Sequence, residues 1–246
     1  FVHVKGNVQV LLHYTWCTCH HIRVADFIHP CNDTSSACLI KATQDAIPEF
    51  VKGLPNIGLD VLDPFFIKKL SIPLSGLTFT FYDGKMSGFS NCIVDNVVSE
   101  LEKRHFLLAF HCNLTIEGTY DAKGRILLLE IDGAGDAKIE LTNLRMIVDI
   151  NTKYINKKGL NYFSIKSYNY SVDYGDHVSF DIQNLFKESK ELSATVLNFL
   201  NENWRMVVDE FGKPIVDYAV NLAVKTIAKF FKVVPYEELI NVPIPQ

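Results

Sequence analysis

The chain has 246 residues, of which 48% are hydrophobic and 21% charged, and its formal net charge is −4. A mildly acidic chain has no electrostatic reason to approach a phosphate backbone, so we expect no nucleic-acid partner. The length suits one domain with a sizeable core, and no apolar run is long enough to span a bilayer, which predicts a soluble protein.

The first 27 residues contain no element that we can predict. Their apolar stretch, "VQVLLHYTW" (8–16), is too short and too polar for a signal-peptide core. The "CTCHH" segment (17–21) has metal-ligand residue types without a usual ligand spacing, and no second ligand cluster follows. We therefore expect residues 1–27 to be disordered or absent from the mature fold, residues 28–246 to form a single domain, and no metal or cofactor.

A short helix is predicted over residues 36–51, because its apolar residues recur at helical spacing and Ser35 or Ser36 can cap it. Cys31 and Cys38 are seven positions apart. Cys31 precedes this helix and Cys38 lies in its first turn. A disulfide between them would contribute about 2 kcal/mol and fix where the helix begins. Such a bridge needs an oxidising compartment, which indicates an exported protein.

The period of the apolar residues changes to two after Pro64. Strands are predicted over 77–84, 106–120, 125–133, 138–151, 160–175 and 177–186. Asp83-Gly84 predicts a hairpin turn, and residues 122–124 predict a connection between two strands. The glycines of "GAGDAK" (133–138) predict a further turn, and Gly175-Asp176 predicts the turn between the last two strands. Short turns between successive strands favour an antiparallel meander.

One strand changes phase. Ile139 and Leu141 lie on one parity, whereas Leu144 and the apolar residues after it lie on the other. A β-bulge near Thr142-Asn143 would restore a single apolar face and bend the strand. Long strands with bulges predict a curved sheet.

Cys92 and Cys112 each lie ten residues from position 102, inside the polar stretch "SELEKRH". If this stretch is a hairpin turn, the two cysteines oppose each other across the ladder. The register decides between a disulfide and two core thiols, and the residues leave both open.

From Leu192 to Phe231 apolar residues recur at three-and-four spacing, which predicts one long helix. Pro214, with Gly212 beside it, should kink this helix midway. No second long helix is available as a partner, so the apolar stripe must bury against the concave face of the sheet. This predicts an α+β fold in which a strongly curved antiparallel sheet wraps a long C-terminal helix.

Two interpretations of the interior compete: the apolar side chains fill it as core, or they leave an elongated apolar pocket. Strand parity and helix face select a hypothetical lining of Phe79, Phe81, Phe110, Leu129, Ile131, Met146, Val148, Phe163, Ile165, Phe180, Trp204, Phe211 and Tyr218. The tyrosines that could offer a hydroxyl group to it are Tyr82, Tyr162, Tyr168 and Tyr218. For each of these we favour a position on the surface of a strand or helix, where the hydroxyl meets water.

Four segments resemble the juvenile hormone-binding and takeout proteins of insects. They are "CNDTSSACLIKATQDAIPEF", "IEGTYDAKGRILLLEIDGAGDAKIELTNL", "YSVDYGDHVSFDIQNLF" and the C-terminal "LNFLNENWRMVVDEFGKPIVDYAVNLAVKTIAKFFKVVPYEELI", and the resemblance covers about residues 30–240. It implies the tubular lipid-binding fold and a secreted, monomeric carrier of a small hydrophobic ligand, a terpenoid such as juvenile hormone or a fatty acid, with a role in circadian or feeding regulation. It also implies that a Cys31–Cys38 bridge anchors the first helix near a tunnel mouth.

The sequence departs from the family in one respect. The haemolymph hormone carriers have a second bridge in their C-terminal half, whereas this chain has no cysteine after Cys112. The pattern is closer to the takeout-like branch, so juvenile hormone is one candidate ligand among several. A Cys92–Cys112 bridge would be a variation of this protein.

Other functions have weaker support. The sequence has no nucleophile-elbow, zinc-protease or phosphate-loop motif, so we predict no catalytic residues and no enzyme activity. A lipid-transfer protein acting transiently at a membrane surface is the alternative, and its basic loop would be "INKKGLNYF" (155–163). Sequons at Asn32, Asn113 and Asn169 are candidate glycosylation sites.

Overall fold

The fold was determined as a computed structural model that describes residues 26–74, 76–126 and 129–245. Its helices are α1 (Ser36–Phe50), α2 (Lys190–Glu202), α3 (Trp204–Phe211), α4 (Lys213–Val233) and α5 (Tyr236–Leu239), with two short 3-10 helices, η1 (Pro55–Ile57) and η2 (Phe89–Asn91). Its strands are β1 (Phe65–Leu74), β2 (Leu77–Ser87), β3 (Ile93–Glu100), β4 (His105–Ile126), β5 (Leu129–Lys157), β6 (Leu160–Asp173) and β7 (His177–Ile182).

The sheet is built on one very long hairpin, β4–β5, whose pairing runs from His105 opposite Asn151 to Ile126 opposite Leu129. Two strands lie end to end along the free edge of each central strand. β2 and β3 pair with the two halves of β4, and β7 and β6 pair with the two halves of β5, while β1 pairs with β2. The sheet is antiparallel throughout, but the predicted meander is wrong, because β4 and β5 are long enough to take two neighbours on one edge.

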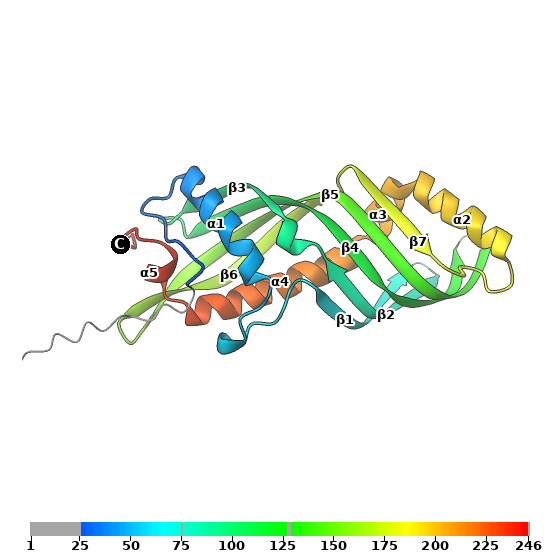
Figure 1. The fold of residues 1–246 in the computed structure, drawn as a ribbon, viewed down its shortest axis with the longest axis horizontal. Coiled ribbons are helices and arrows are strands. Elements are labelled where there is room, and N and C mark those ends of the chain that lie inside the picture. The colour runs from blue at the N-terminus through cyan, green and yellow to red at the C-terminus, as the bar shows by residue number, and fades with distance from the viewer. Residues whose placement is uncertain (1–25, 75, 127–128, 246) are drawn as a thin grey trace, which may run out of the picture.

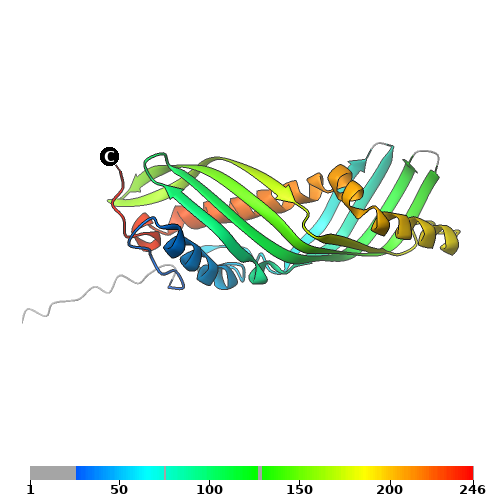
Figure 2. The ribbon, with the colours of Figure 1, turned by 90° about the horizontal axis from the view of Figure 1, so that it is seen from above.

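The sheet curls around the C-terminal helices, as Figures 1 and 2 show. α4 runs along the concave face, α2 lies beside β7 at the right-hand end of Figure 1, and α1 lies outside the sheet across β3. The predicted α+β class, a curved antiparallel sheet wrapping a C-terminal helix, is confirmed.

The C-terminal helix is divided into three segments, so its predicted continuity is wrong. A break at Gly212 precedes Pro214, where a kink is predicted, and a second break lies at Asn203. The Asn203 backbone leaves the helical region, and its side-chain Nδ2 donates to the Phe199 carbonyl oxygen (2.9 Å). An asparagine is a poor helix former that offers this alternative hydrogen bond, and periodicity alone does not reveal it.

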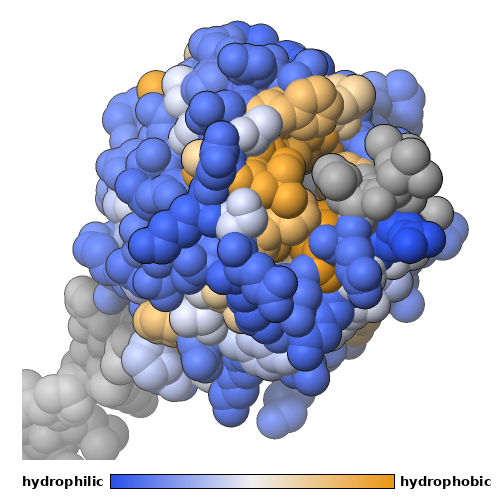
Figure 3. Space-filling view, turned by 90° about the vertical axis from the view of Figure 1, so that its right-hand side faces the viewer, coloured by the Kyte–Doolittle hydropathy of each residue, from blue (hydrophilic) through white to orange (hydrophobic). Residues whose placement is uncertain are grey.

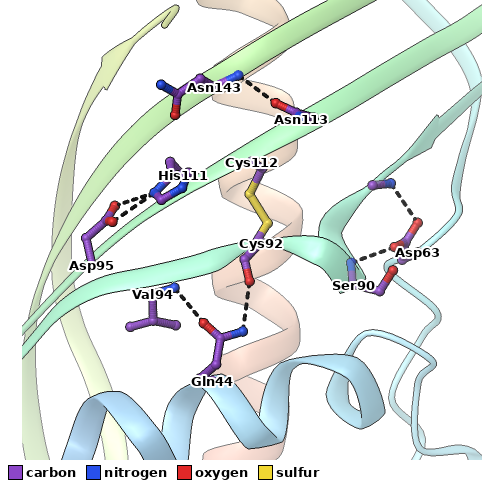
Figure 4. Close-up of a disulfide and its surroundings, with 11 residues drawn as sticks. Gln44, Asp63, Ser90, Cys92, Val94, Asp95, His111, Cys112, Asn113 and Asn143 are labelled. Atoms are coloured by element: carbon purple, nitrogen blue, oxygen red, sulfur yellow. Dashed lines mark hydrogen bonds and ion pairs between the residues drawn. A yellow bond between two sulfur atoms is a disulfide. The ribbon is translucent and has the colours of Figure 1, made fainter. Parts of the chain in front are cut away.

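The bulge predicted near Thr142-Asn143 is confirmed. Residues 142 and 143 together oppose Asn113 between the pairs Leu141–Leu114 and Leu144–Cys112. Asn143 takes a left-handed conformation (φ 59°), and its backbone N–H donates to Asn113 Oδ1 (2.7 Å; Figure 4). The side chain of one strand therefore satisfies the backbone group that the bulge frees.

Three predicted turns are wrong. Asp83-Gly84 is a bulge inside β2, where the Phe81 ring lies so close that a Cβ atom on Gly84 would approach it to 2.3 Å. Residues 122–124 stay paired with β5. Gly133 and Gly135 of "GAGDAK" lie within β5, and a Cβ atom on Gly133 would be 2.6 Å from the Leu185 carbonyl oxygen. These glycines admit close neighbours and do not reverse the chain.

The N-terminal helix begins as predicted. Ser35 caps α1, with its hydroxyl oxygen accepting from the Cys38 N–H (3.5 Å). A Cys31–Cys38 disulfide joins its first turn to a segment whose Cys31 carbonyl accepts from Asn241 N–H (2.8 Å). The bridge thus ties α1 to the C-terminal segment.

A second disulfide joins Cys92, the residue before β3, to Cys112 of β4 (Figure 4). The polar stretch around position 102 forms the turn between these strands, as predicted. Beside the bridge, the Gln44 carboxamide of α1 donates to the Cys92 carbonyl (3.0 Å) and accepts from the Val94 N–H (2.8 Å). This pair of hydrogen bonds satisfies the outer edge of β3 and holds α1 against it.

The expectations for residues 1–25, including the "CTCHH" segment, lie outside the described residues. Phe27 packs against a small cluster of Leu59, Phe230 and Val234. Within the described ranges, no group of three or more His, Cys, Asp and Glu side chains could hold a metal ion.

Candidate functional site

A cavity of about 200 Å³ lies between the concave face of the sheet and helices α2–α4, at the right-hand end of Figure 1. Its described lining comprises Ile72, Leu77, Phe79, Ile116, Ala122, Ile131, Ile139, Leu141, Tyr174, Val178, Phe180, Ile182, Leu185, Val196, Leu200, Val207, Val208, Phe211, Gly212, Ile215 and Val216. Viewed from that end, apolar side chains gather in a hollow framed by hydrophilic residues (Figure 3). The site is an apolar pocket that opens at one end of the molecule.

The helix breaks create this pocket. Because the helix is interrupted at Asn203 and Gly212, α2 follows β7 instead of continuing along the axis of α4. The Asn201 carboxamide fixes α2 to β7, since its Nδ2 donates to the Phe180 carbonyl (2.9 Å) and its Oδ1 accepts from the Phe180 N–H (2.8 Å). Val196 and Leu200 of α2 then form one wall of the cavity.

The lining has almost no polar chemistry. Tyr174 is the one residue with a polar side-chain atom among the described lining residues, and none of them is charged. Burial raises the pKa of the Tyr174 hydroxyl to about 12, so it stays protonated at physiological pH. Since roughly 10–15 Å³ of such space admits one water molecule, the cavity holds on the order of 15 non-hydrogen atoms.

The opposite end of the interior is filled. Phe106, Tyr154, Phe163, Phe231 and Tyr236 form a cluster of rings with centroids 5.0–5.7 Å apart. The described cavity therefore stops short of this end and occupies only part of the length of the sheet.

The structure brings some of the residues selected by parity to the cavity and leaves others elsewhere. Those that line it are Phe79, Ile131, Phe180 and Phe211. Those that pack in other parts of the interior are Phe81, Phe110, Met146, Val148, Phe163, Ile165, Trp204 and Tyr218. The side chain of Leu129 lies outside the described part. Parity identifies the inward face, but it does not identify where helix and sheet separate.

None of the four tyrosines proposed as hydroxyl donors, Tyr82, Tyr162, Tyr168 and Tyr218, lines the cavity, whereas Tyr174 does. Strand parity does not select Tyr174 because β6 contains a bulge. Asn151 pairs with Ser167 but Thr152 pairs with Ile165, so Lys166 is an extra residue in β6. At this bulge the residues that point inward change from odd to even numbers, and Tyr174 is one of the even-numbered ones.

The Cys31–Cys38 bridge lies away from this cavity, because α1 contributes no described lining residue. Its expected position near a tunnel mouth stays a prediction.

A strongly curved antiparallel sheet around a helical axis, with an apolar cavity between them, defines an α+β protein of the tubular lipid-binding class. The chain belongs to the haemolymph juvenile hormone binding protein family, which matches residues 10–241. The resemblance seen in the sequence is thus confirmed. Proteins of this family bind hydrophobic ligands and are not known as enzymes.

Individual relatives agree with this assignment. The crystal structure of takeout 1 from Epiphyas postvittana has a TM-score of 0.83 at 38% identity, over 87% of this chain and 100% of that one. The circadian clock-controlled protein daywake of Drosophila melanogaster is 24% identical over 91% of this chain and 92% of its own. Daywake of Drosophila yakuba is 25% identical over 85% of each. In the described ranges no helix is both long and apolar enough to cross a membrane.

Proposed function

We propose that this protein is a secreted carrier that holds one small hydrophobic molecule, a terpenoid or a fatty-acid-like chain, in the cavity beside α2 and α3. The observation that carries the proposal is the lining, which is apolar except for one hydroxyl group. Such a surface binds ligands through burial and not through charge. Membership of a family of hydrophobic-ligand carriers supports the same function.

The size of the cavity supports useful affinity. Burying about 12 methylene groups at ~0.8 kcal/mol each gives on the order of 10 kcal/mol, from which the cost of immobilising the ligand is subtracted. A micromolar dissociation constant corresponds to about 8 kcal/mol. The gross gain from burial thus exceeds the free energy of micromolar binding by about 2 kcal/mol, and a preformed cavity favours affinity because it keeps the cost of immobilisation low.

Export from the cell is the second part of the proposal. Two disulfides, Cys31–Cys38 and Cys92–Cys112, persist only in an oxidising compartment. The sequon residues Asn32, Asn113 and Asn169 are all exposed, which would admit glycans.

Native mass spectrometry of the protein from a eukaryotic secretion host tests the carrier function. We expect a stoichiometric adduct of a few hundred daltons, released chemically unchanged on denaturation, because a cavity of this size holds on the order of 15 non-hydrogen atoms. A mass that stays that of the protein alone after incubation with terpenoids and fatty acids would contradict the proposal.

The membrane-transfer alternative depends on Lys157 and Lys158, which we expect to be irrelevant to ligand binding. Lys157 Nζ donates to the Lys232 carbonyl at the C-terminal end of α4 (3.2 Å), whereas Val216, near the other end, lines the cavity. About 24 Å of helix separates these positions. Lys157→Glu with Lys158→Glu should leave ligand affinity within twofold of the wild type in a probe-displacement titration. Parallel loss of ligand uptake and of co-sedimentation with anionic vesicles would favour the transfer function instead.

A further inference from the structure

One polar side-chain atom belongs to the described lining of this cavity, the Tyr174 hydroxyl oxygen. Tyr174 is only 7% exposed and lines the pocket. No hydrogen bond is formed by its hydroxyl with any described residue, whereas the other strongly buried tyrosines bond to backbone carbonyls, Tyr120 to Gln183 (2.6 Å) and Tyr236 to Val242 (2.7 Å). The hydroxyl oxygen keeps some accessible surface toward the cavity and is not tied to a protein acceptor, so an acceptor atom that occupies the cavity can bond to it without displacing a protein hydrogen bond.

The surrounding structure positions this hydroxyl rigidly. Arg205 of α3 bonds to the two residues that flank Tyr174 in the chain. It donates to Asp173 Oδ1 (2.9 Å) and to the Gly175 carbonyl oxygen (2.8 Å). The hydroxyl lies over the helix break at Gly212, where a Cβ atom would be 2.3 Å from its oxygen. Gly212 has ordinary helical dihedral angles (φ −74°, ψ −28°), so glycine is needed there for space and not for conformation.

The charges nearby indicate which ligand oxygen fits. The described lining supplies no cation to compensate a buried carboxylate. The Asp209 and Asp217 carboxylates contribute to the raised pKa of the Tyr174 hydroxyl, and among the described residues Lys213 acts in the opposite direction. A neutral acceptor oxygen suits this position, whereas an ionised fatty-acid head group does not.

We propose that Tyr174 is the specificity-determining residue of the cavity and that it donates a hydrogen bond to a ligand with an apolar chain and one neutral oxygen, such as a ketone, an aldehyde or an ester. The inference rests on the proposed carrier function and narrows its ligand class. It makes the cavity selective for neutral oxygenated chains over hydrocarbons and over free fatty-acid anions.

The test compares three probes of one chain length, tridecane, 2-tridecanone and tridecanoate, by displacement of a fluorescent apolar dye. In Tyr174→Phe the affinity for 2-tridecanone should fall roughly three- to tenfold, as for loss of one neutral hydrogen bond, while the affinity for tridecane is unchanged. The wild type should bind 2-tridecanone more tightly than tridecanoate. The melting temperature of Tyr174→Phe should equal or exceed that of the wild type, because no protein hydrogen bond is lost.

Tyr236→Phe is the matched control, since its hydroxyl is bonded within the protein at the filled end. It should melt at a lower temperature and keep the wild-type ratio of ketone to hydrocarbon affinity. Failure of the wild type to bind any of the probes would overturn the carrier function itself. Binding of the probes with equal loss for ketone and hydrocarbon in Tyr174→Phe, or with no loss, would overturn only the role of Tyr174. Tightest binding of tridecanoate would overturn the neutral-ligand class.

Discussion

Leu200→Trp is expected to weaken the binding of 2-tridecanone about 100-fold. Leu200 lies on the half-buried face of α2 and lines the cavity, so a larger side chain there extends into the space that the ligand needs. Excluding about four ligand carbons at ~0.8 kcal/mol each removes roughly 3 kcal/mol of binding free energy, which is a factor of about 100 in Kd. Dye displacement measures this change directly.

Phe199→Trp is the matched control for this variant. Phe199 is the neighbouring residue of α2, it is 51% exposed, and it does not line the cavity. Both variants introduce a tryptophan into the same helix turn, but only one does so inside the pocket. We expect Phe199→Trp to bind the ketone as the wild type does. Equal effects of the two substitutions would mean that the ligand site lies elsewhere in the protein.

The elements that the sequence predicts well are those set by local chemistry. The helix that Ser35 caps needs only a capping side chain and a helical apolar period, and both lie within a few residues. The bulge at Thr142-Asn143 is predictable because apolar parity changes within one strand only where the ladder takes in an extra residue. The hairpin that brings Cys92 opposite Cys112 follows likewise from a polar turn between apolar strands.

The incorrect predictions of turns at Asp83-Gly84 and in "GAGDAK" have the same non-local cause. Glycine in a strand and glycine in a turn look alike in the sequence. What distinguishes them is the neighbour that the missing Cβ atom admits, the Phe81 ring over Gly84 and the Leu185 carbonyl over Gly133. The second neighbour comes from a segment more than fifty residues away, which local pattern does not specify.

The position of the cavity depends on a similar non-local feature. Phe79 and Met146 both point inward, but only Phe79 faces the region where α2 turns away from the axis of α4. That turn depends on Asn203, which interrupts an apolar pattern that is otherwise continuous. Inward parity thus predicts candidate lining residues, while the helix break decides which of them face space and which are packed.

Removal of the Cys92–Cys112 bridge is the second large effect that we expect. Cys92→Ala with Cys112→Ala should lower the free energy of unfolding by about 3 kcal/mol, because the bridge closes a loop of 20 residues in the unfolded chain. For a protein of this size the melting temperature should fall by roughly 10 °C. Both cysteines are at most 4% exposed, so alanine leaves no buried polar group at either position.

Cys31→Ala with Cys38→Ala provides the comparison, since its loop has a separation of seven residues and should cost only about 2 kcal/mol. Chemical denaturation of both variants, without reductant, measures the difference.

The position of the bridge also predicts which part of the protein loosens. Cys92 supplies the carbonyl to which Gln44 of α1 bonds, so hydrogen exchange should rise in α1 and β3 when the bridge is removed. No described residue of α1 or β3 lines the cavity. Ligand affinity, measured well below the melting temperature, should therefore be unchanged. A loss of affinity comparable to that of Leu200→Trp would show instead that the binding region and the bridged strands open as one cooperative unit.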